Sequence, residues 1–119
     1  MSEIKRNYVA KRLSESALHQ GVIYLAGQVA SDPSQDMAGQ TRQVLADVDR
    51  LLAEINSDKT CILQCTIFIS DMSKVADMNS VWDAWVSPGH TPPRATVQAQ
   101  LGSPQKLIEV VVIAATRNR

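Results

Sequence analysis

Arg94 and Glu109 are the two residues whose chemical types and surroundings point most directly to a reaction or a binding event. Glu109 is the single carboxylate in the apolar run 107–115, and Arg94 opens the preceding strand-like segment, 94–101. Burying an ionised group costs free energy unless the group is paired or has a task. A guanidinium suits a planar carboxylate because two parallel N–H donors match two oxygens. These residues therefore predict either a structural ion pair or a site for a small anion.

The register between these two segments decides whether Arg94 and Glu109 can meet. We expect segments 94–101 and 107–115 to form an antiparallel pair joined by a turn at Gly102-Ser103-Pro104. With an even-numbered turn, Arg94, Thr96 and Glu109 share one face of the sheet. A slip of one residue would instead group Glu109 with Ala95, Val97 and Ala99. Patterning by itself favours the ion pair and leaves the ligand site open.

Hydrophobic periodicity predicts the elements that hold these residues. Apolar residues recur every three or four positions over 35–56 and over 73–86, which predicts two amphipathic helices, the second with Ser73 as its N-cap. In that second helix Trp82 and Trp85 lie on the apolar stripe, so we expect them in the core or in a subunit contact. Segments rich in β-branched and apolar residues predict strands at 7–13, 17–19, 22–25, 62–69, 94–101 and 107–115.

The order of these elements predicts one α+β domain over residues 1–119, a sandwich with two helices on one face of a mixed sheet. Segment 107–115 is hydrophobic at both its odd-numbered and its even-numbered positions, so the second face of the sheet also carries apolar side chains. A chain of 119 residues has nothing left to cover that second face. Self-association is the simplest way to bury it, and we expect an oligomer.

Composition narrows the classes of partner. The 12 basic and 12 acidic residues balance, which gives no support for a nucleic-acid footprint. No signal-like apolar segment follows Met1, and the apolar runs fall well short of the ~20 residues that a membrane-spanning helix needs. We therefore expect a cytoplasmic protein that acts without a membrane or a nucleic acid.

The remaining candidate ligands and nucleophiles form no recognisable set. Cys61 and Cys65 match neither a C-x-x-C motif nor a larger ligand pattern, and we expect reduced, packed thiols. His19 and His90 lie in no ligand pattern, whereas a zinc site needs three or four convergent ligands. Glycine-rich phosphate loops are absent from the sequence. We expect neither a metal nor a cofactor.

Several short motifs, taken together, resemble one known family over nearly the whole chain. They are Gly27-Gln28, Gln40-Thr41, Asp71-Met72, Asn79, Pro93-Arg94-Ala95-Thr96-Val97 and Ile108-Glu109-Val110. In this combination the chain resembles the Rid family, also called the YjgF or L-PSP family, and segments 82–86, 89–90 and 94–99 resemble its YoaB-like branch. The resemblance implies a chorismate-mutase-like fold, a homotrimer with sites in the clefts between subunits, and imine or enamine deaminase activity.

The same resemblance implies a role for each matching residue. Arg94 matches the family arginine that binds the substrate carboxylate, and Glu109 matches the glutamate thought to hold or activate the hydrolytic water. Thr96 stands where the best-known deaminases carry cysteine, and Asn79 matches the family asparagine of the second helix. Gly27 matches the backbone position that lines the pocket from the neighbouring subunit.

At two positions the chain lacks a polar side chain that the family pattern places in the implied pocket. Ala26 stands where the best-known deaminases have a serine, and their N-terminal tyrosine has no match around Leu13-Ser14-Glu15. The substrate can therefore differ from 2-aminoacrylate.

Three functions follow, in order of preference. The first is hydrolysis of small 2-imino or 2-enamino acids to 2-oxo acids and ammonia. The second is non-catalytic binding or sensing of a 2-oxo acid in the same cleft. The third is RNA cleavage, which has been ascribed to members of this family, although the balanced charge and the lack of a basic, aromatic-studded strand weigh against it.

Overall fold

The computed structural model describes residues 3–117. Its strands are β1 (Lys5–Val9), β2 (Ser14–His19), β3 (Val22–Leu25), β4 (Gln28–Val29), β5 (Ile62–Ile69), β6 (Arg94–Gln98) and β7 (Ile108–Ala115). Its α-helices are α1 (Met37–Glu54) and α2 (Val75–Trp85), and short 3₁₀ turns lie at η1 (Lys59–Cys61) and η2 (Met72–Lys74).

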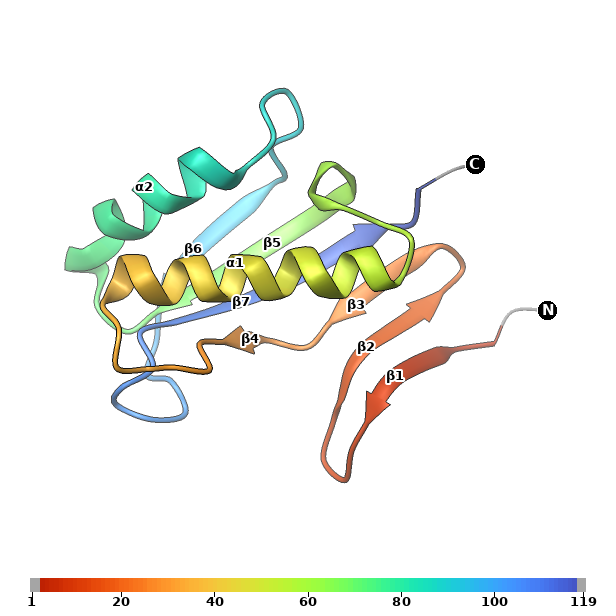
Figure 1. Ribbon diagram of the computed structural model, residues 1–119, viewed down its shortest axis with the longest axis horizontal. Coiled ribbons are helices and arrows are strands. Elements are labelled where there is room, and N and C mark those ends of the chain that lie inside the picture. Colours follow the sequence, from red (N-terminus) through yellow and green to blue (C-terminus); the bar gives the residue numbers. More distant parts are fainter. Residues whose placement is uncertain (1–2, 118–119) are drawn as a thin grey trace.

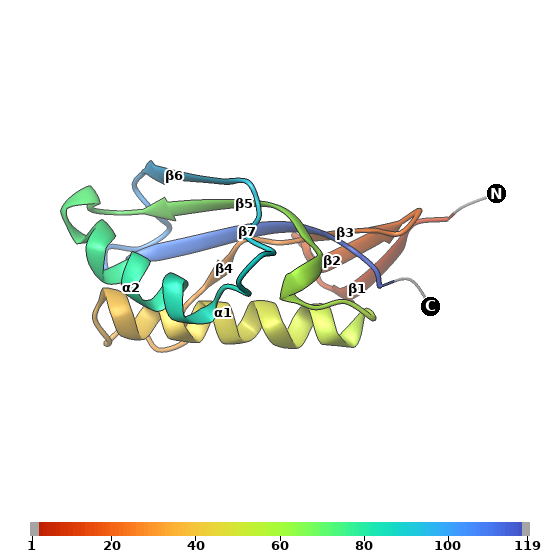
Figure 2. The same cartoon turned by 90° about the horizontal axis from the view of Figure 1, so that it is seen from above.

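These elements form two layers. The strands build one mixed sheet in the order β1-β2-β3-β7-β5-β6, and β4 pairs with β7 off this path. Seen edge-on, α1 and α2 lie together on one side of the sheet, with the other side free of helices (Figure 2). The α+β architecture with two helices on one face is thereby confirmed.

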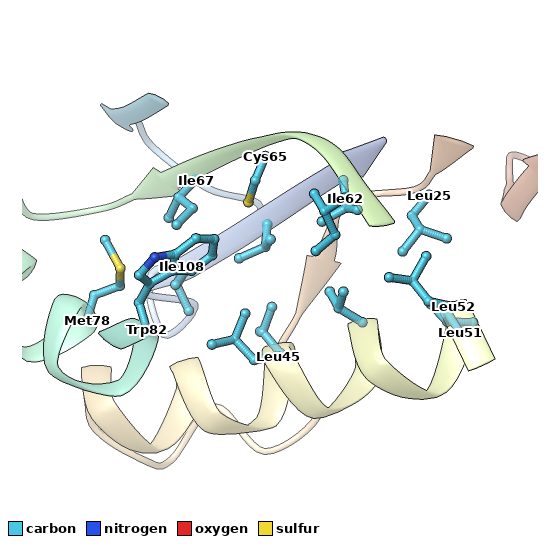
Figure 3. Packing of buried hydrophobic residues seen from close by; sticks show 14 of the residues in the cluster. Leu25, Leu45, Leu51, Leu52, Ile62, Cys65, Ile67, Met78, Trp82 and Ile108 are labelled. Carbon is cyan, nitrogen blue, oxygen red and sulfur yellow. The ribbon is translucent and has the colours of Figure 1, made fainter. Parts of the chain in front are cut away.

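The apolar spacing and the capping residues explain why α1 forms and where it begins and ends. Asp36 begins it by accepting a hydrogen bond from the Gly39 N–H at 2.9 Å. Asn56, at φ 58°, adopts the left-handed conformation that ends many helices. Its buried face consists of Met37, Val44, Leu45, Val48, Leu51 and Leu52, together with small and polar residues. Figure 3 shows Leu51 and Leu52 at one end of this core, and Met78 and Trp82 at the other.

The second helix starts later than the sequence indicates. Ser73 was predicted as its N-cap, but that prediction is wrong, because Ser73 lies inside η2 and α2 begins at Val75. The N-cap position of α2 is Lys74, which makes no side-chain cap hydrogen bond. Asp71 instead caps η2, because its side chain accepts the Ser73 N–H at 3.0 Å. The buried residues of α2 are Met78 and Trp82.

At the N-terminal end, the predicted strand 7–13 is confirmed only over residues 7–9, which belong to β1. Residues 10–13 form the turn to β2, closed by Ala10 N–H donating to Leu13 O at 2.9 Å. The predicted hairpin around Gln20-Gly21 is confirmed, and positive φ angles of 52° and 79° at these residues suit the tight turn that joins β2 to β3. Strand β5 is confirmed at residues 62–69.

The predicted antiparallel pairing of 94–101 with 107–115 is also wrong, because β5 lies between β6 and β7 (Figure 1). Strand β6 runs parallel to β5, and β7 runs antiparallel to it. Helix α2 is the crossover that a parallel pair requires. The loop 99–107 passes around the end of β5, held by Ala99 N–H to Ile69 O at 2.9 Å and Ser70 N–H to Leu107 O at 3.0 Å.

The helix-free face of the sheet is apolar, as predicted. Along β7, residues 108, 110, 112 and 114 are buried under the helices, whereas the alternate residues 109, 111, 113 and 115 are only partly buried. Tyr24, paired with Ile113, is 48% exposed, and Val97 is 42% exposed. We call the helix-free face around β3, β5, β6 and β7 the open face. Neither helix of residues 3–117 combines the length and hydrophobicity that crossing a membrane requires.

Candidate active site

The strand register places Arg94 and Glu109 on opposite faces of the sheet. Arg94 pairs with Cys65 of β5, and Cys65 is buried under the helices. Glu109 pairs with Phe68 of β5, three positions further along. Because side chains alternate between faces along a strand, Arg94 lies on the helix-covered face and Glu109 on the open face.

This geometry overturns the ion pair and the shared-face register within one chain. Arg94 and Glu109 are separated by two inter-strand spacings and three residue positions, roughly 10 Å in each direction. None of the salt bridges among the described residues joins them. The expectation failed because it assumed that consecutive strands are neighbours, whereas β5 separates them.

Arg94 lies at the sheet edge against the second helix. Its guanidinium carbon is 5.1 Å from the centroid of the Trp82 ring, a cation–π distance. The Trp82 side chain is buried, but Arg94 itself is exposed. No salt bridge between described residues includes Arg94. Its N–H donors are therefore available to an outside anion.

Two of the predicted site residues have buried polar atoms without a hydrogen-bond partner among the described residues. They are Thr96 Oγ1, on the same strand and face as Arg94, and Asn79 Oδ1, one helical turn before Trp82 on α2. The large majority of buried polar side-chain atoms are hydrogen-bonded, so such atoms need an explanation. Both atoms are enclosed by the chain itself, so a partner from outside reaches them only when the surrounding side chains shift.

Cys65 lies beside this group and was not singled out from the sequence. Burial raises the pKa of its thiol to about 12, and the positive charge of Arg94 acts in the opposite direction. The thiol is therefore protonated at neutral pH and is a poor nucleophile. Both cysteines are free, as predicted.

Glu109 belongs to a second group, formed with the turn that precedes β4. An added Cβ at Gly27 would lie 2.8 Å from Glu109 Cδ and closer still to Oε2, so the carboxylate rests directly on the Gly27 backbone. The neighbouring Ala26 is held by its backbone: its N–H donates to Glu15 O at 2.9 Å, and its carbonyl accepts from Gln28 Nε2 at 2.9 Å. The side chain at position 26 adds no polar group.

The predicted site residues thus fall into two groups within one chain. We call Arg94, Thr96, Asn79 and Trp82 the arginine half-site, and Glu109, Gly27 and Ala26 the glutamate half-site. Trp82 was expected only in the core or in a subunit contact, and no local pattern links it to Arg94, since the chain turns back between them.

A prominent hollow on the surface of the described residues lies elsewhere. It measures about 560 Å³ and is lined by Ser70 and residues 98–104, so it contains neither Arg94 nor Glu109. Within residues 3–117, no three His, Cys, Asp or Glu side chains converge in a way that could hold a metal ion.

Comparison with known proteins identifies the class to which this fold and these half-sites belong. The profile of the family described as "Endoribonuclease L-PSP" matches residues 3–116. The chain is a member of this family, the Rid or YjgF family.

Individual relatives agree along nearly the whole chain. A RutC family protein of Haemophilus ducreyi is 42% identical over 116 residues, which cover 98% of this chain and 99% of that protein. The RutC family protein YoaB of Escherichia coli K12 is 40% identical, covering 87% and 90%. The crystal structure of NMB1025, a YjgF family member from Neisseria meningitidis, superposes with a TM-score of 0.96 at 41% identity, covering 98% of each chain.

Proposed function

We propose that this protein is a homotrimeric hydrolase that converts small 2-imino or 2-enamino acids to 2-oxo acids and ammonia, at sites shared between neighbouring subunits. The observation that carries the proposal is the placement of Arg94 and Glu109 on opposite faces of one sheet. If both act on one substrate, they must come from different chains. The apolar open face around Glu109 is the surface on which a second chain would pack.

In such a site the arginine half-site binds the substrate. The guanidinium of Arg94 takes the carboxylate through two parallel N–H donors and fixes the position of the reacting carbon. The oxygens of Thr96 and Asn79 are enclosed in the unbound chain, and they accept hydrogen bonds from the nitrogen end or from bound water once the surrounding side chains shift. Binding at this half-site requires no covalent step.

The glutamate half-site, from the neighbouring chain, performs the proton transfers. The Glu109 carboxylate orients a water and accepts one of its protons as the oxygen bonds to the imine carbon. That proton then passes to the nitrogen. This gives a carbinolamine, whose hydroxyl proton passes through Glu109 to the nitrogen as the C–N bond breaks and the oxygen forms the carbonyl, which releases ammonia and a 2-oxo acid. A 2-enamino acid first takes up a proton at its β-carbon and becomes the 2-imino acid. The close approach of Gly27 keeps the carboxylate in place.

Complementation between two inactive variants tests the shared site. Arg94→Ala and Glu109→Gln should each lose ammonia release from enzymatically generated 2-imino acids. Co-refolded in equal amounts, they should recover about a quarter of the wild-type rate, because random assembly unites an intact arginine with an intact glutamate at about one interface in four. A mixture without recovered activity contradicts the shared site.

The matched control is wild type mixed with the double variant that carries both substitutions. A shared site predicts about a quarter of the wild-type rate per chain, and a site within one chain predicts about a half. This arm also shows that mixed oligomers form.

Non-catalytic binding of a 2-oxo acid is the second candidate, and the unengaged donors of Arg94 favour it. It predicts that pyruvate raises the melting temperature in an Arg94-dependent way, while imine hydrolysis stays at background. RNA cleavage, which the family description names, would have to survive the loss of both Arg94 and Glu109 to belong to a separate site.

A further inference from the structure

The guanidinium that we assign to substrate binding lies over the Trp82 indole. The Trp82 side chain is only 6% exposed, and its ring centroid lies 5.1 Å from Arg94 Cζ. A carboxylate partner would neutralise Arg94 and occupy its donor edge. An aromatic face attracts the cation and leaves that edge free.

Trp82 is itself held by a second aromatic contact. Its ring packs against Trp85 with centroids 5.3 Å apart and planes inclined by 50°. Trp85 is tied to α1, because its Nε1–H donates to Asp49 Oδ2 at 2.9 Å. Lys59 adds a hydrogen bond to the Trp85 carbonyl at 2.6 Å and lies 5.2 Å from its ring.

These contacts connect α1 to β6 without a break. Asp49 fixes Trp85, Trp85 packs on Trp82, and Trp82 faces Arg94. An arginine side chain loses rotamer freedom when its head is fixed. A guanidinium already held against a ring loses less of that freedom when an anion binds.

We propose that Trp82 is a positioning residue, which holds the Arg94 guanidinium with its donor edge open to a carboxylate ligand, and that the Trp85–Asp49 hydrogen bond keeps Trp82 in place. The identity of the ligand rests on the proposed function. The positioning role itself concerns only binding and does not require turnover.

Two substitutions of Trp82 separate ring chemistry from packing. Trp82→Leu keeps an apolar side chain but removes the aromatic face, and Trp82→Tyr keeps an aromatic face. Trp82→Leu should weaken pyruvate binding, measured by calorimetry, about 3- to 30-fold, which corresponds to the range of cation–π contributions. Trp82→Tyr should stay within about threefold of wild type.

The kinetic pattern distinguishes positioning from general damage. A carboxylate contact is made in both the ground state and the transition state, so Trp82→Leu should raise KM by a similar factor while kcat changes less than about twofold. Trp85→Phe keeps a ring against Trp82 but removes the donor to Asp49, and it should give a smaller loss of the same kind.

Leu52→Ala is the matched control for core damage. Leu52 is fully buried in α1, at the far end of the core from Trp82 (Figure 3). It should lower the melting temperature without changing pyruvate affinity. Equal weakening of pyruvate binding by Leu52→Ala and Trp82→Leu would reduce the Trp82 effect to lost packing and overturn the inference.

The outcomes separate this inference from the proposed function. Arg94- and Trp82-dependent pyruvate binding without imine hydrolysis would overturn the deaminase and uphold the positioning role. Wild-type affinity in Trp82→Leu would overturn the positioning role, even in an active enzyme. A wild-type protein without any Arg94-dependent carboxylate binding would overturn both.

Discussion

The carboxylate of Glu109 rests against the backbone of Gly27, so closely that a methyl group at position 27 would stand 2.8 Å from Glu109 Cδ. The carboxylate is the far end of a flexible side chain and is able to move aside. Gly27 therefore determines where the Glu109 carboxylate lies and has little influence on whether the chain folds.

Gly27→Ala should consequently separate activity from stability. We expect the free energy of unfolding to change by less than about 1 kcal/mol, and imine hydrolysis to fall at least about tenfold because the displaced carboxylate no longer orients the water. Urea unfolding and ammonia release measure the two effects. Gly102→Ala is the control, because nothing lies within 4 Å of an added Cβ there. Unchanged activity in Gly27→Ala would contradict the role of Glu109.

A charge placed on the open face should dissociate the oligomer. Val111 lies in the middle of β7, on the open face opposite Thr66 of β5. Val111→Lys would place an unpaired ammonium in the proposed interface, which is costly to desolvate. Sedimentation should show monomers without imine hydrolysis.

The control for this change is Ala53→Lys, which adds the same charge at an exposed position of α1. It should leave both the mass and the activity of the assembly unchanged. A Val111→Lys protein that keeps the mass of the wild-type assembly would place the subunit interface elsewhere.

The two cysteines should differ in reactivity. The pKa of Cys65 is raised by burial to about 12 from an ordinary value of 9.0, whereas Cys61 is partly exposed. At pH 8 a thiol reagent should modify Cys61 in the native protein and leave Cys65 protected until unfolding. Cys61→Ser should then show almost no native reactivity, and rapid labelling of that variant would contradict the burial of Cys65.

The same raised pKa gives a pH dependence of stability. Because the unfolded thiol ionises first, the contribution of Cys65 is fully present below about pH 9 and is lost as the pH rises toward 12. The free energy of unfolding should decline over this window. Cys65→Val should decline less steeply, and identical slopes would be inconsistent with a buried, neutral thiol.

Gln40 should be a major contributor to stability. Its side chain is fully buried, and its Oε1 accepts the Leu107 N–H at 3.0 Å. Its Nε2 donates to the carbonyls of Pro33, Gln35 and Gln105 at 3.1, 2.9 and 2.9 Å. Gln40→Leu leaves these groups unpaired and should cost about 2–4 kcal/mol in urea unfolding. Gln100→Leu, at an exposed position, should cost less than about 0.5 kcal/mol.

Much of the fold could be predicted because its signals are local. The helical period over 35–56, the apolar run 62–69 and the Gln20-Gly21 turn all express their structure within a few residues, and each prediction agrees with the structure to within a few positions. The wrong predictions concern positions whose conformation depends on residues outside the local sequence pattern. Ser73 lies inside η2, which Asp71 caps, and a turn ends the predicted strand 7–13 after residue 9.

The residue types of the candidate site were also accessible from the chain itself. Arg94, Thr96, Asn79, Gly27 and Glu109 all lie where they can contribute to one of the two half-sites. A lone carboxylate in an apolar run and an arginine at a strand start are local signals of polar chemistry, whatever their partners. Nothing in the sequence marked Trp82 and Cys65 as members of the site. Each stands among apolar residues on a helix or strand, and that pattern indicates packing in the core.

Which groups come together was decided by the three-dimensional arrangement alone. Arg94 and Glu109 end on opposite faces because the α2 crossover places β6 beside β5, while the loop 99–107 carries β7 to the other side of β5. Side-chain direction along a strand depends on the pairing register, and pairing between distant segments is a non-local property. The sequence by itself indicated the candidate site residues, and the insertion of β5 between β6 and β7 divided them into two half-sites.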